Sequence, residues 1–406
     1  MKVTATIPQS SLEKLSKNFK MVSYLMTAFT KTYGVITGNT LTFYFKGNKS
    51  VVALALELDA PCASDVYFSI DISKFLSAAK KIGNTQPLKL LINLTPPSML
   101  LTSDSTNDKI TFSVSFYEAD SPEILSLLSF YTENEPQFTN GEKFLATPAF
   151  LDFAHIASTY MGTINKNNSI AMFQDKLVYA DRTVVVSMAA SVWQGSQIWK
   201  DPDEHRMLHK FILGFIDFVA ADNAAFTLST NKNLIRWTSQ DPSFWAILAI
   251  DPCNITIPSQ EDLENIVPED TRTHSITLKP SRMVEAIDFF SGLFEASVWK
   301  PITFTWTNDN GTQRIVLSYK HPSTEVEKEL TVDINDGNLS VDTAAFTLIS
   351  DSLRTLLTRM MDTGDITLKF NDLEVDTLHG AGVELVYRDI SGTEVYRAVL
   401  AKLADS

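Results

Sequence analysis

The chain has 406 residues, of which 44% are hydrophobic and 20% charged, and 34 Lys and Arg stand against 48 Asp and Glu, for a net charge of −14. This composition is typical of a globular protein, and the length corresponds to two to four domains of about 100 to 200 residues each. The low content of glycine (15) and proline (16) excludes collagen, low-complexity disorder and a coiled coil.

Cysteine content and hydropathy indicate the compartment. The two cysteines, Cys62 and Cys253, are far apart and cannot form a disulfide framework or a four-thiolate zinc site, so a reducing compartment is expected. The N-terminal sequence MKVTATIPQSSLEKLSK alternates apolar and polar residues, unlike a signal peptide. No stretch approaches the roughly 18 uncharged apolar residues of a membrane span. We therefore expect a cytoplasmic protein that makes no contact with a membrane.

Amphipathic periodicity predicts six helices of roughly three turns each. They cover residues 11–26, 71–82, 149–161, 206–220, 280–295 and 350–361. Residues typical of helix starts stand at four of them, namely Asp71 or Ser73, Pro148, Pro280, and Ser350 or Asp351.

Strand patterns of period two fill the segments between these helices. Three hairpins are predicted from their turns: residues 41–58 around Gly47-Asn48, residues 302–320 around Asn-Asp-Asn-Gly, and residues 383–400 around Ser391-Gly392. Such short connections favour antiparallel meanders over parallel crossovers.

The six helices fall into three pairs, and an alternating strand precedes most of them, as in VYFSIDISKFLSAA and HSITLKPSRMVEA. A unit of strand, helix and several strands, repeated six times and grouped in twos, explains this pattern. The alternative is an ordinary α+β protein. Polar stretches at 132–143 and 259–273 indicate the boundaries of three domains of about 135 residues, at 1–132, 133–265 and 266–406.

Three segments resemble the bacterial-type DNA polymerase sliding clamp, the β processivity factor. KLVYADRTVVVSM (176–188) is similar to the family's strand-turn-strand in the middle domain, but two residues shorter. Residues 339–370, followed by EVYRAVLAKL, resemble its final helix and closing strand, and FTKTYGVITGNTLTF (29–43) resembles the loop after its first helix. The closing strand has Val-Leu-Ala where the family favours Met-Pro-Met, and the middle turn lacks the usual Gly-His before Arg182. These departures fit a divergent clamp, such as one encoded by a phage.

The resemblance implies an α+β fold of three similar clamp domains, each with two helices packed on antiparallel sheets, which together form half of a ring. A head-to-tail homodimer would complete the ring around double-stranded DNA and tether the replicative DNA polymerase. An ATP-driven clamp loader is implied as the partner that opens the ring, because the chain itself has no GxxxxGK[ST] or GxGxxG motif. No enzymatic activity and no cofactor are expected.

The distribution of charge agrees with this resemblance. The six predicted helices carry a net +3, so the rest of the chain carries −17. In the family the helices line the hole, where Lys and Arg meet phosphates without reading bases. The alternative is that each cation is merely solvated. The residues implied to face DNA are Lys14, Lys17, Lys20, Lys31, Lys74, Lys80, Lys81, Arg206, Lys210, Arg282, Arg354 and Arg359.

Sliding clamps bind partner peptides in a hydrophobic pocket between the second and third domains. An apolar cleft with a few polar edges can bury the anchor side chains of a peptide. Without the resemblance, the apolar members of this set would be assigned to the core. The implied groove residues are Met172, Arg182, Thr183, Val184, Pro268, Val399 and Leu400.

Two other classes of protein remain as alternatives. His205 and His209 are four residues apart, a spacing that places both on one face of a helix and could hold zinc, but no third ligand is evident, so no metal site is expected. There is no GxSxG motif, although a hydrolase could assemble its site from distant residues. A structural or adaptor protein, for example a phage assembly component, would share the acidic composition but lack a basic inner wall.

Overall fold

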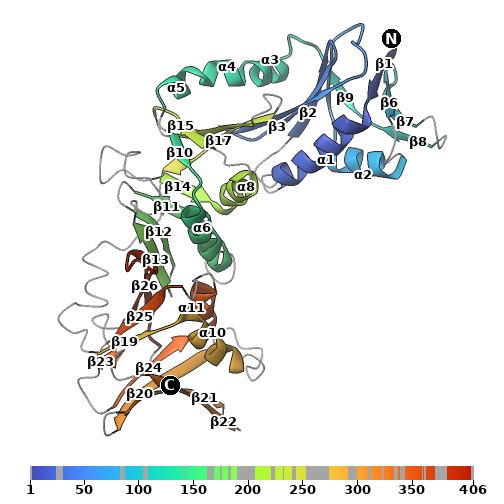
Figure 1. Ribbon diagram of the computed structural model, residues 1–406. Helices are drawn as coiled ribbons and strands as arrows, with labels where there is room; N and C mark the ends of the chain where they lie inside the picture. Colours follow the sequence, from blue (N-terminus) through green and yellow to red (C-terminus); the bar gives the residue numbers. More distant parts are fainter. Residues whose placement is uncertain are drawn as a thin grey trace. The chain divides into compact units, whose positions relative to one another are not determined.

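The structure, a computed structural model, divides into two compact units (Figure 1). Unit 1 comprises Met1–Ala146 and Phe211–Pro252, and unit 2 comprises Thr147–Lys210 and Cys253–Ser406. The residues that the structure describes are 2–23, 31–82, 87–103, 108–141, 143–161, 169–173, 176–181, 184–189, 206–220, 225–231, 233–239, 244–252, 274–290, 300–309, 312–321, 324–332, 337–338, 343–358, 360, 363–370 and 382–403.

A strand, a helix and a three-stranded antiparallel meander recur six times along the described chain. The first three copies are β1 (Lys2–Ile7), α1 (Gln9–Ser23), β2 (Lys31–Thr37), β3 (Thr40–Lys46) and β4 (Val51–Glu57); β5 (Val66–Ser69), α2 (Ile72–Ile82), β6 (Leu88–Leu94), β7 (Pro97–Thr102) and β8 (Lys109–Phe112); and β10 (Lys143–Leu145), α6 (Pro148–Tyr160), β11 (Ser169–Met172), β12 (Lys176–Ala180) and β13 (Val184–Ala189).

The next three copies follow the same order of elements, which confirms the predicted sixfold repeat. They are β14 (Arg206–His209), α8 (Lys210–Ala220), β15 (Ala225–Leu228), β16 (Leu234–Thr238) and β17 (Phe244–Ala249); β19 (His274–Leu278), α10 (Pro280–Phe289), β20 (Pro301–Asp309), β21 (Thr312–His321) and β22 (Thr324–Val332); and β24 (Thr343–Ile349), α11 (Ser350–Leu357), β25 (Asp365–Phe370), β26 (Gly382–Arg388) and β27 (Glu394–Ala401). Between copies lie β9 (Ser115–Tyr117), α3 (Pro122–Leu128), α4 (Phe130–Asn134), α5 (Pro136–Thr139), β18 (Asp251–Pro252) and β23 (Gly337–Asn338).

Neighbouring copies exchange their first strands. In the first pair, β1 pairs with β6 of the second copy, while β5 pairs with β2 of the first. The same exchange joins β10 to β15 and β14 to β11, and then β19 to β25 and β24 to β20. Because each copy completes the sheet of the other, the six copies form three pairs of an α+β architecture.

The last meander strands join these pairs edge to edge. In unit 1, β4 pairs with β17, and in unit 2, β13 pairs with β27. The resulting long sheets run β10-β15-β16-β17-β4-β3-β2-β5-β9 in unit 1 and β14-β11-β12-β13-β27-β26-β25-β19-β23 in unit 2. The two smaller sheets, β1-β6-β7-β8 and β22-β21-β20-β24, each end on a last meander strand. Among the described residues, no strand pairs with the outer edge of β8 or β22.

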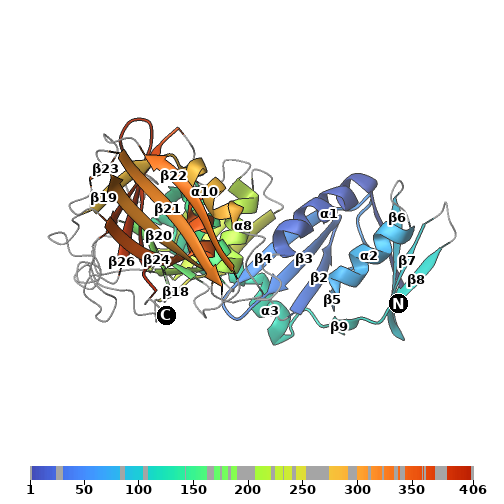
Figure 2. The same ribbon diagram turned by 90° about the horizontal axis from the view of Figure 1, so that it is seen from below.

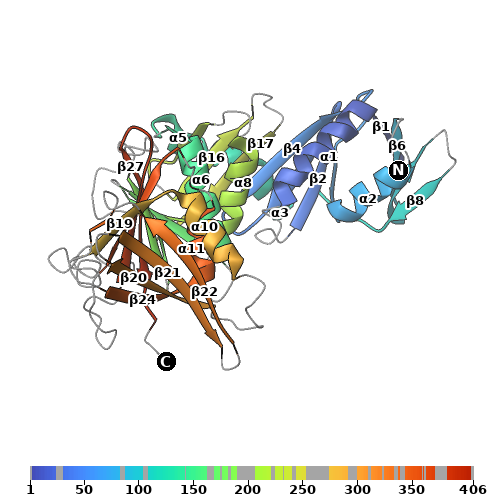
Figure 3. The same cartoon turned by 60° about the horizontal axis from the view of Figure 1, so that its bottom comes forward.

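Strand alternation divides each sheet into two faces. On β3, buried Phe43 and Phe45 point towards the helices, with ring centroids 5.6 Å from Phe75 of α2 and 6.4 Å from Phe19 of α1. The intervening Tyr44 faces the other way, where α3 to α5 cover the sheet (Figures 1 and 2). In unit 2, α10 and α11 lie side by side (Figure 3).

The three predicted hairpins are confirmed, and their turns explain them. As expected, β3 pairs antiparallel with β4, β20 with β21, and β26 with β27. In the last turn Gly392 has φ +81°, a left-handed conformation that favours glycine. Asp389 Oδ1 accepts from the backbone N–H groups of Ser391 (2.9 Å) and Thr393 (3.0 Å), which fixes the turn.

The four predicted helix starts lie where helices begin; α10 begins at Pro280 and α11 at Ser350. In the other two segments side chains cap the helix. Asp71 Oδ1 accepts from the N–H of Lys74 at 3.1 Å, so Asp71 rather than Ser73 caps α2. Pro148 occupies the first turn of α6, where Thr147 accepts from the N–H of Phe150 at 3.2 Å. The side-chain acceptors satisfy N–H groups that have no partner inside the helix.

Two predictions of secondary structure are corrected. The helix expected over 206–220 starts only at Lys210, because residues 206–209 form β14 and pair with β11 from Ser169↔His209 to Met172↔Arg206. The polar stretch 132–143, interpreted from its sequence as a linker, forms parts of α4 and α5. Pairing with a distant strand in the first case, and burial of Phe138 in the second, override the local pattern.

Candidate nucleic-acid interface and peptide groove

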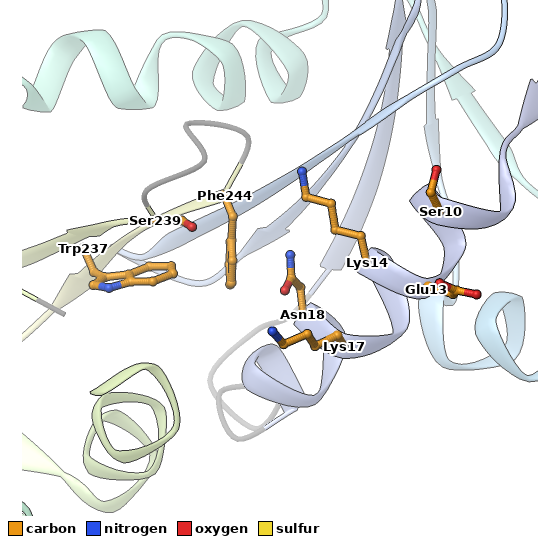
Figure 4. A pocket seen from close by; sticks show the side chains of 8 residues that line it. All are labelled: Ser10, Glu13, Lys14, Lys17, Asn18, Trp237, Ser239 and Phe244. Atoms are coloured by element: carbon orange, nitrogen blue, oxygen red, sulfur yellow. The ribbon is translucent and has the colours of Figure 1, made fainter. Parts of the chain in front are cut away.

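Helix α1 carries its basic residues on a flank away from the sheet. Leu15 and Val22 are fully buried, whereas Lys17 is exposed and Lys14 is half-buried. Lys14 and Lys17 line the same cavity of about 390 Å³, which the structure places between α1 and the ends of β16 and β17 (Figure 4). The structure therefore brings together two residues predicted to face DNA. The side chain of Lys20 lies outside the described part of the chain.

Helix α2 provides a second group of cations in unit 1. Lys80 and Lys81 are exposed in its last turn, where the partial negative charge of the helix C-terminus favours cations. Lys80 also lines a smaller cavity, about 130 Å³, between α1 and α2. Lys74 is exposed and forms an ion pair with Asp71 at 3.4 Å. Lys31 is exposed at the start of β2.

The remaining cations differ in how much of their charge is available. Arg282 is exposed on α10. Lys210 Nζ donates to the carbonyl oxygen of Met161 at 2.9 Å. Arg354 forms a two-pronged ion pair with Asp288 of α10, and this carboxylate raises the pKa of Arg354 and offsets its charge.

The structure does not support or describe the expected position of two predicted cations, Arg206 and Arg359. Arg206 lies on strand β14 and not on a helix, so the geometry assumed for it is corrected. Its side chain, and Arg359 as a whole, fall outside the described residues.

The predicted peptide groove falls on the join between β13 and β27. Val184 pairs with Leu400, and the next pair is Val185 with Val399. Val184, Leu400 and Met172 are at most 2% exposed, so these three side chains belong to the core. Val399 is half-buried on the opposite face of the strand. Arg182, Thr183 and Pro268 lie outside the described residues.

Sequence reasoning missed the apolar cluster on that opposite face. Val178, Ala180 and Val185 pack there together with half-buried Phe173. Val185 is the register partner of Val399, so Val399 lies beside this cluster. The signal was present in the alternation of the strands, because Val184 and Val185 must face opposite sides of the sheet.

The turn between β12 and β13 is held by Asp181. Its Oδ1 accepts from the N–H of Val184 at 3.0 Å, and its Oδ2 accepts from the hydroxyl of Tyr179 at 3.0 Å. Burial first, and then the carboxylate of Asp181, raise the pKa of the Tyr179 hydroxyl.

The zinc hypothesis loses its geometric basis. His209 lies on strand β14, where Nδ1 is 2.6 Å from Ser169 Oγ, while His205 falls outside the described residues. Within the described ranges, no group of three or more His, Cys, Asp or Glu side chains could hold a metal ion. In the same ranges, every helix is too short or too polar to cross a bilayer.

The arrangement of these elements matches solved structures along the whole chain. DNA polymerase III subunit beta from Pseudomonas aeruginosa matches with a TM-score of 0.69 and 13% identity, covering 99% of this chain and 100% of that one. The chain has the fold of the bacterial sliding clamps. This clamp fold is shared by the Helicobacter pylori beta clamp bound to a DNA ligase peptide (TM-score 0.68, 12% identity) and the C. crescentus beta sliding clamp (0.68, 11%), each match covering 100% of both chains.

The clamp fold confirms the resemblance seen in the sequence, and the low identity makes this a divergent example. No protein-family model and no curated protein matches the sequence. The repeat of strand, helix and meander therefore indicated the fold more clearly than the short sequence motifs did.

Proposed function

We propose that this protein is a DNA sliding clamp, a non-enzymatic processivity factor that encircles duplex DNA without reading its sequence and tethers the replicative DNA polymerase. The observation that carries the proposal is the match to solved sliding clamps over the whole chain. The exposed lysines of α1 and α2 support it, because a sliding ring needs phosphate contacts that carry no sequence information. In the cytoplasm, a clamp loader would open the ring for DNA.

The proposed ring is a head-to-tail homodimer, and the sheet edges support it. Within the chain, last meander strands join in two places, β4 to β17 and β13 to β27. The corresponding last meander strands of the two smaller sheets, β8 and β22, have no partner on their outer edges among the described residues. If β8 of one copy pairs with β22 of another, and the reverse, both edges are covered and the ring closes with two-fold symmetry.

Charge is also complementary between these two edges. Strand β22 carries three glutamates and one lysine. Strand β8 carries one charged residue, the exposed Lys109. Opposite charges of this kind favour contact between unlike ends and disfavour contact between like ends.

A topological assay tests the function. Purified protein is loaded with its host's loader and ATP onto nicked circular plasmid, isolated by gel filtration, and the plasmid is then cut once. A clamp stays on the circle and leaves the linear molecule, because it is held by linkage and not by tight binding. Equal retention on both forms would indicate ordinary DNA binding, and no retention on the circle would favour a structural or adaptor protein.

The apolar surface formed by Phe173, Val185 and Val399 is the proposed docking site for partner peptides, with Arg182, Thr183 and Pro268 as further contacts. The DNA ligase peptide on the Helicobacter pylori clamp shows that a protein of this fold takes such a ligand. We expect Val399→Asp to abolish binding of that peptide, measured by fluorescence anisotropy. Ile390→Asp is the matched control, because Ile390 is 85% exposed in the turn of the same hairpin. Equal loss in both variants would contradict the assignment.

A further inference from the structure

The join of β4 and β17 in unit 1 repeats the join of β13 and β27 in unit 2. Each join pairs the last meander strands of two neighbouring pairs of copies through four residue pairs. Val51 is the register partner of Ile247 across the first join. Val185 and Val399 hold the same relation across the second. The outer side of the β4–β17 join is therefore the counterpart, in unit 1, of the apolar surface proposed for partner peptides in unit 2.

Helix α3 covers one end of this outer side (Figure 1). Its Ile124 and Leu127 are fully buried in one cluster with Val51. The residues that follow them in the helix, Leu125 and Leu128, are 53% and 39% exposed. Helix α3 therefore docks on the sheet through one face, and its other face also carries apolar side chains.

Aromatic residues of α4 and α5 cover the other end of the outer side. Tyr131 packs against Trp245 of β17 with ring centroids 4.8 Å apart. Phe138 is buried in one cluster with Ile247. Two aromatic anchors set into an apolar sheet face resemble the way in which a bound peptide is held, because such anchors carry most of the binding energy.

Charge is complementary between this segment and the sheet beneath it. Residues 118–141 contain five acidic residues and no Lys or Arg. The sheet supplies cations at two points: Lys46 Nζ donates to Ser126 Oγ at 3.2 Å, and the guanidinium of Arg236 lies 4.9 Å from the centre of the Phe138 ring. An acidic segment with apolar anchors thus meets an apolar face with a basic rim.

The segment depends on the sheet for its helical structure. Helices α3, α4 and α5 have seven, five and four residues, and isolated helices of this length are not stable in water. The segment therefore resembles a ligand that folds on a preformed surface. Because it is tethered to the same chain, its effective concentration at this surface is on the order of millimolar.

We propose that the outer side of the β4–β17 join is a second docking groove, suited to acidic segments with aromatic anchors, and that residues 122–139 are its built-in occupant. The tethered segment excludes partner proteins from this groove, so each chain offers them the groove of unit 2 alone. The role of the unit 2 groove rests on the proposed function. Occupancy of the unit 1 groove by the chain itself is independent of that function.

Fluorescence anisotropy of a labelled peptide of residues 121–140, titrated with the full chain, tests this occupancy. Tyr131→Ser together with Phe138→Ser undocks the tethered segment, so this variant should bind the peptide at least about tenfold more tightly than the unaltered chain does. Leu125→Ser together with Leu128→Ser is the matched control, because these leucines are exposed on the same segment. The control should bind the peptide as weakly as the unaltered chain.

A milder variant and a crosslink locate the binding. Tyr131→Ala removes one anchor and should give an intermediate affinity. A peptide with benzoylphenylalanine in place of Tyr131 should crosslink on irradiation to the strand around Trp245, as mapped by mass spectrometry. Both anchor variants should retain cooperative thermal unfolding, because the sheet remains intact.

Three results would overturn the proposal. The first is peptide binding that is absent from the anchor variants or equal in them and in the leucine control. The second is a crosslink to the strand around Val399 in unit 2. The third is loss of cooperative unfolding in both anchor variants, which would make the segment part of the core of unit 1. Failure of the plasmid assay would overturn the clamp function and leave the groove of unit 1 in place.

Discussion

The hairpin of β12 and β13 is stabilised by the carboxylate of Asp181. A double-mutant cycle can measure the contribution of this carboxylate to the free energy of unfolding. Asp181 accepts from the N–H of Val184 and from the hydroxyl of Tyr179, each at 3.0 Å. Tyr179 is fully buried, while Asp181 is half-buried. The cycle consists of Tyr179→Phe, Asp181→Ala and the double variant.

The structure sets the expected magnitudes. A hydrogen bond to a charged group contributes about 1.5 to 3 kcal/mol, and partial exposure of the carboxylate favours the lower end. Tyr179→Phe removes one such bond and should cost about 1.5 kcal/mol, while Asp181→Ala removes two and should cost about 3 kcal/mol. In the double variant the tyrosine bond is already lost, so the total should stay near about 3 kcal/mol, which gives a coupling of about 1.5 kcal/mol.

Urea unfolding monitored by circular dichroism gives the free energy of unfolding of each variant. The midpoints of thermal unfolding provide an independent check of these free energies. For a unit of this size, 1 kcal/mol corresponds to about 2 to 4 °C in melting temperature. Asp181→Asn is the control, because an amide keeps an oxygen for the N–H of Val184. Additive costs of Tyr179→Phe and Asp181→Ala, with coupling below about 0.5 kcal/mol, would refute the assigned hydrogen bond.

Three further results are expected. Burial raises the pKa of Tyr160 and Tyr179, so their contribution to stability is complete below about pH 10 and is lost as the pH rises above it; Phe variants should flatten denaturant midpoints measured across this range. The Arg397 guanidinium lowers the pKa of Glu394, so stability is lost as the pH falls below about 4.5, and Glu394→Gln should reduce that loss in acid melts. A Cβ on Gly34 would lie 2.2 Å from the buried ring of Phe68, so Gly34→Ala should lower stability by about 1 to 3 kcal/mol, and an unchanged melting temperature would contradict the β2–β5 pairing.

Local signals were sufficient for the repeat. The turn at Ser391-Gly392 is specified by a glycine with positive φ and an aspartate two residues before Ser391, and Pro148 marks a helix start that Thr147 caps. Such features act over a few residues, so they can be read in sequence. The order of strand, helix and meander recurs in six copies, and this repeat also indicated the clamp fold.

Contacts between residues far apart in the chain could not be predicted from such local signals. Residues 206–209 share the apolar pattern of the helix that follows them in the chain. They form strand β14 instead, because they pair with strand β11, nearly 40 residues earlier. The cavity beside α1 joins Asn18 to Trp237 and Phe244, which are more than 200 residues away. No local pattern relates these positions, and only the sheet that joins β4 to β17 brings them together.

The peptide site illustrates an intermediate case. Val184 and Leu400 were assigned to the groove by resemblance, yet their side chains are buried and the neighbouring pair, Val185 and Val399, lies on the other face. The predicted segment lies where β13 pairs with β27, and the pleat of the strands decides which of its side chains are buried. A shift of one residue therefore separates core from surface at this position.

Small-angle X-ray scattering at tens of micromolar protein tests whether two chains close into a ring, because one profile reports both the mass of the particle and the presence of a hole. We expect a hollow particle of about 90 kDa, twice the 45.2 kDa of the chain, with the distance distribution of a ring. A compact particle of 45.2 kDa across the whole concentration series would contradict a ring closed through β8 and β22.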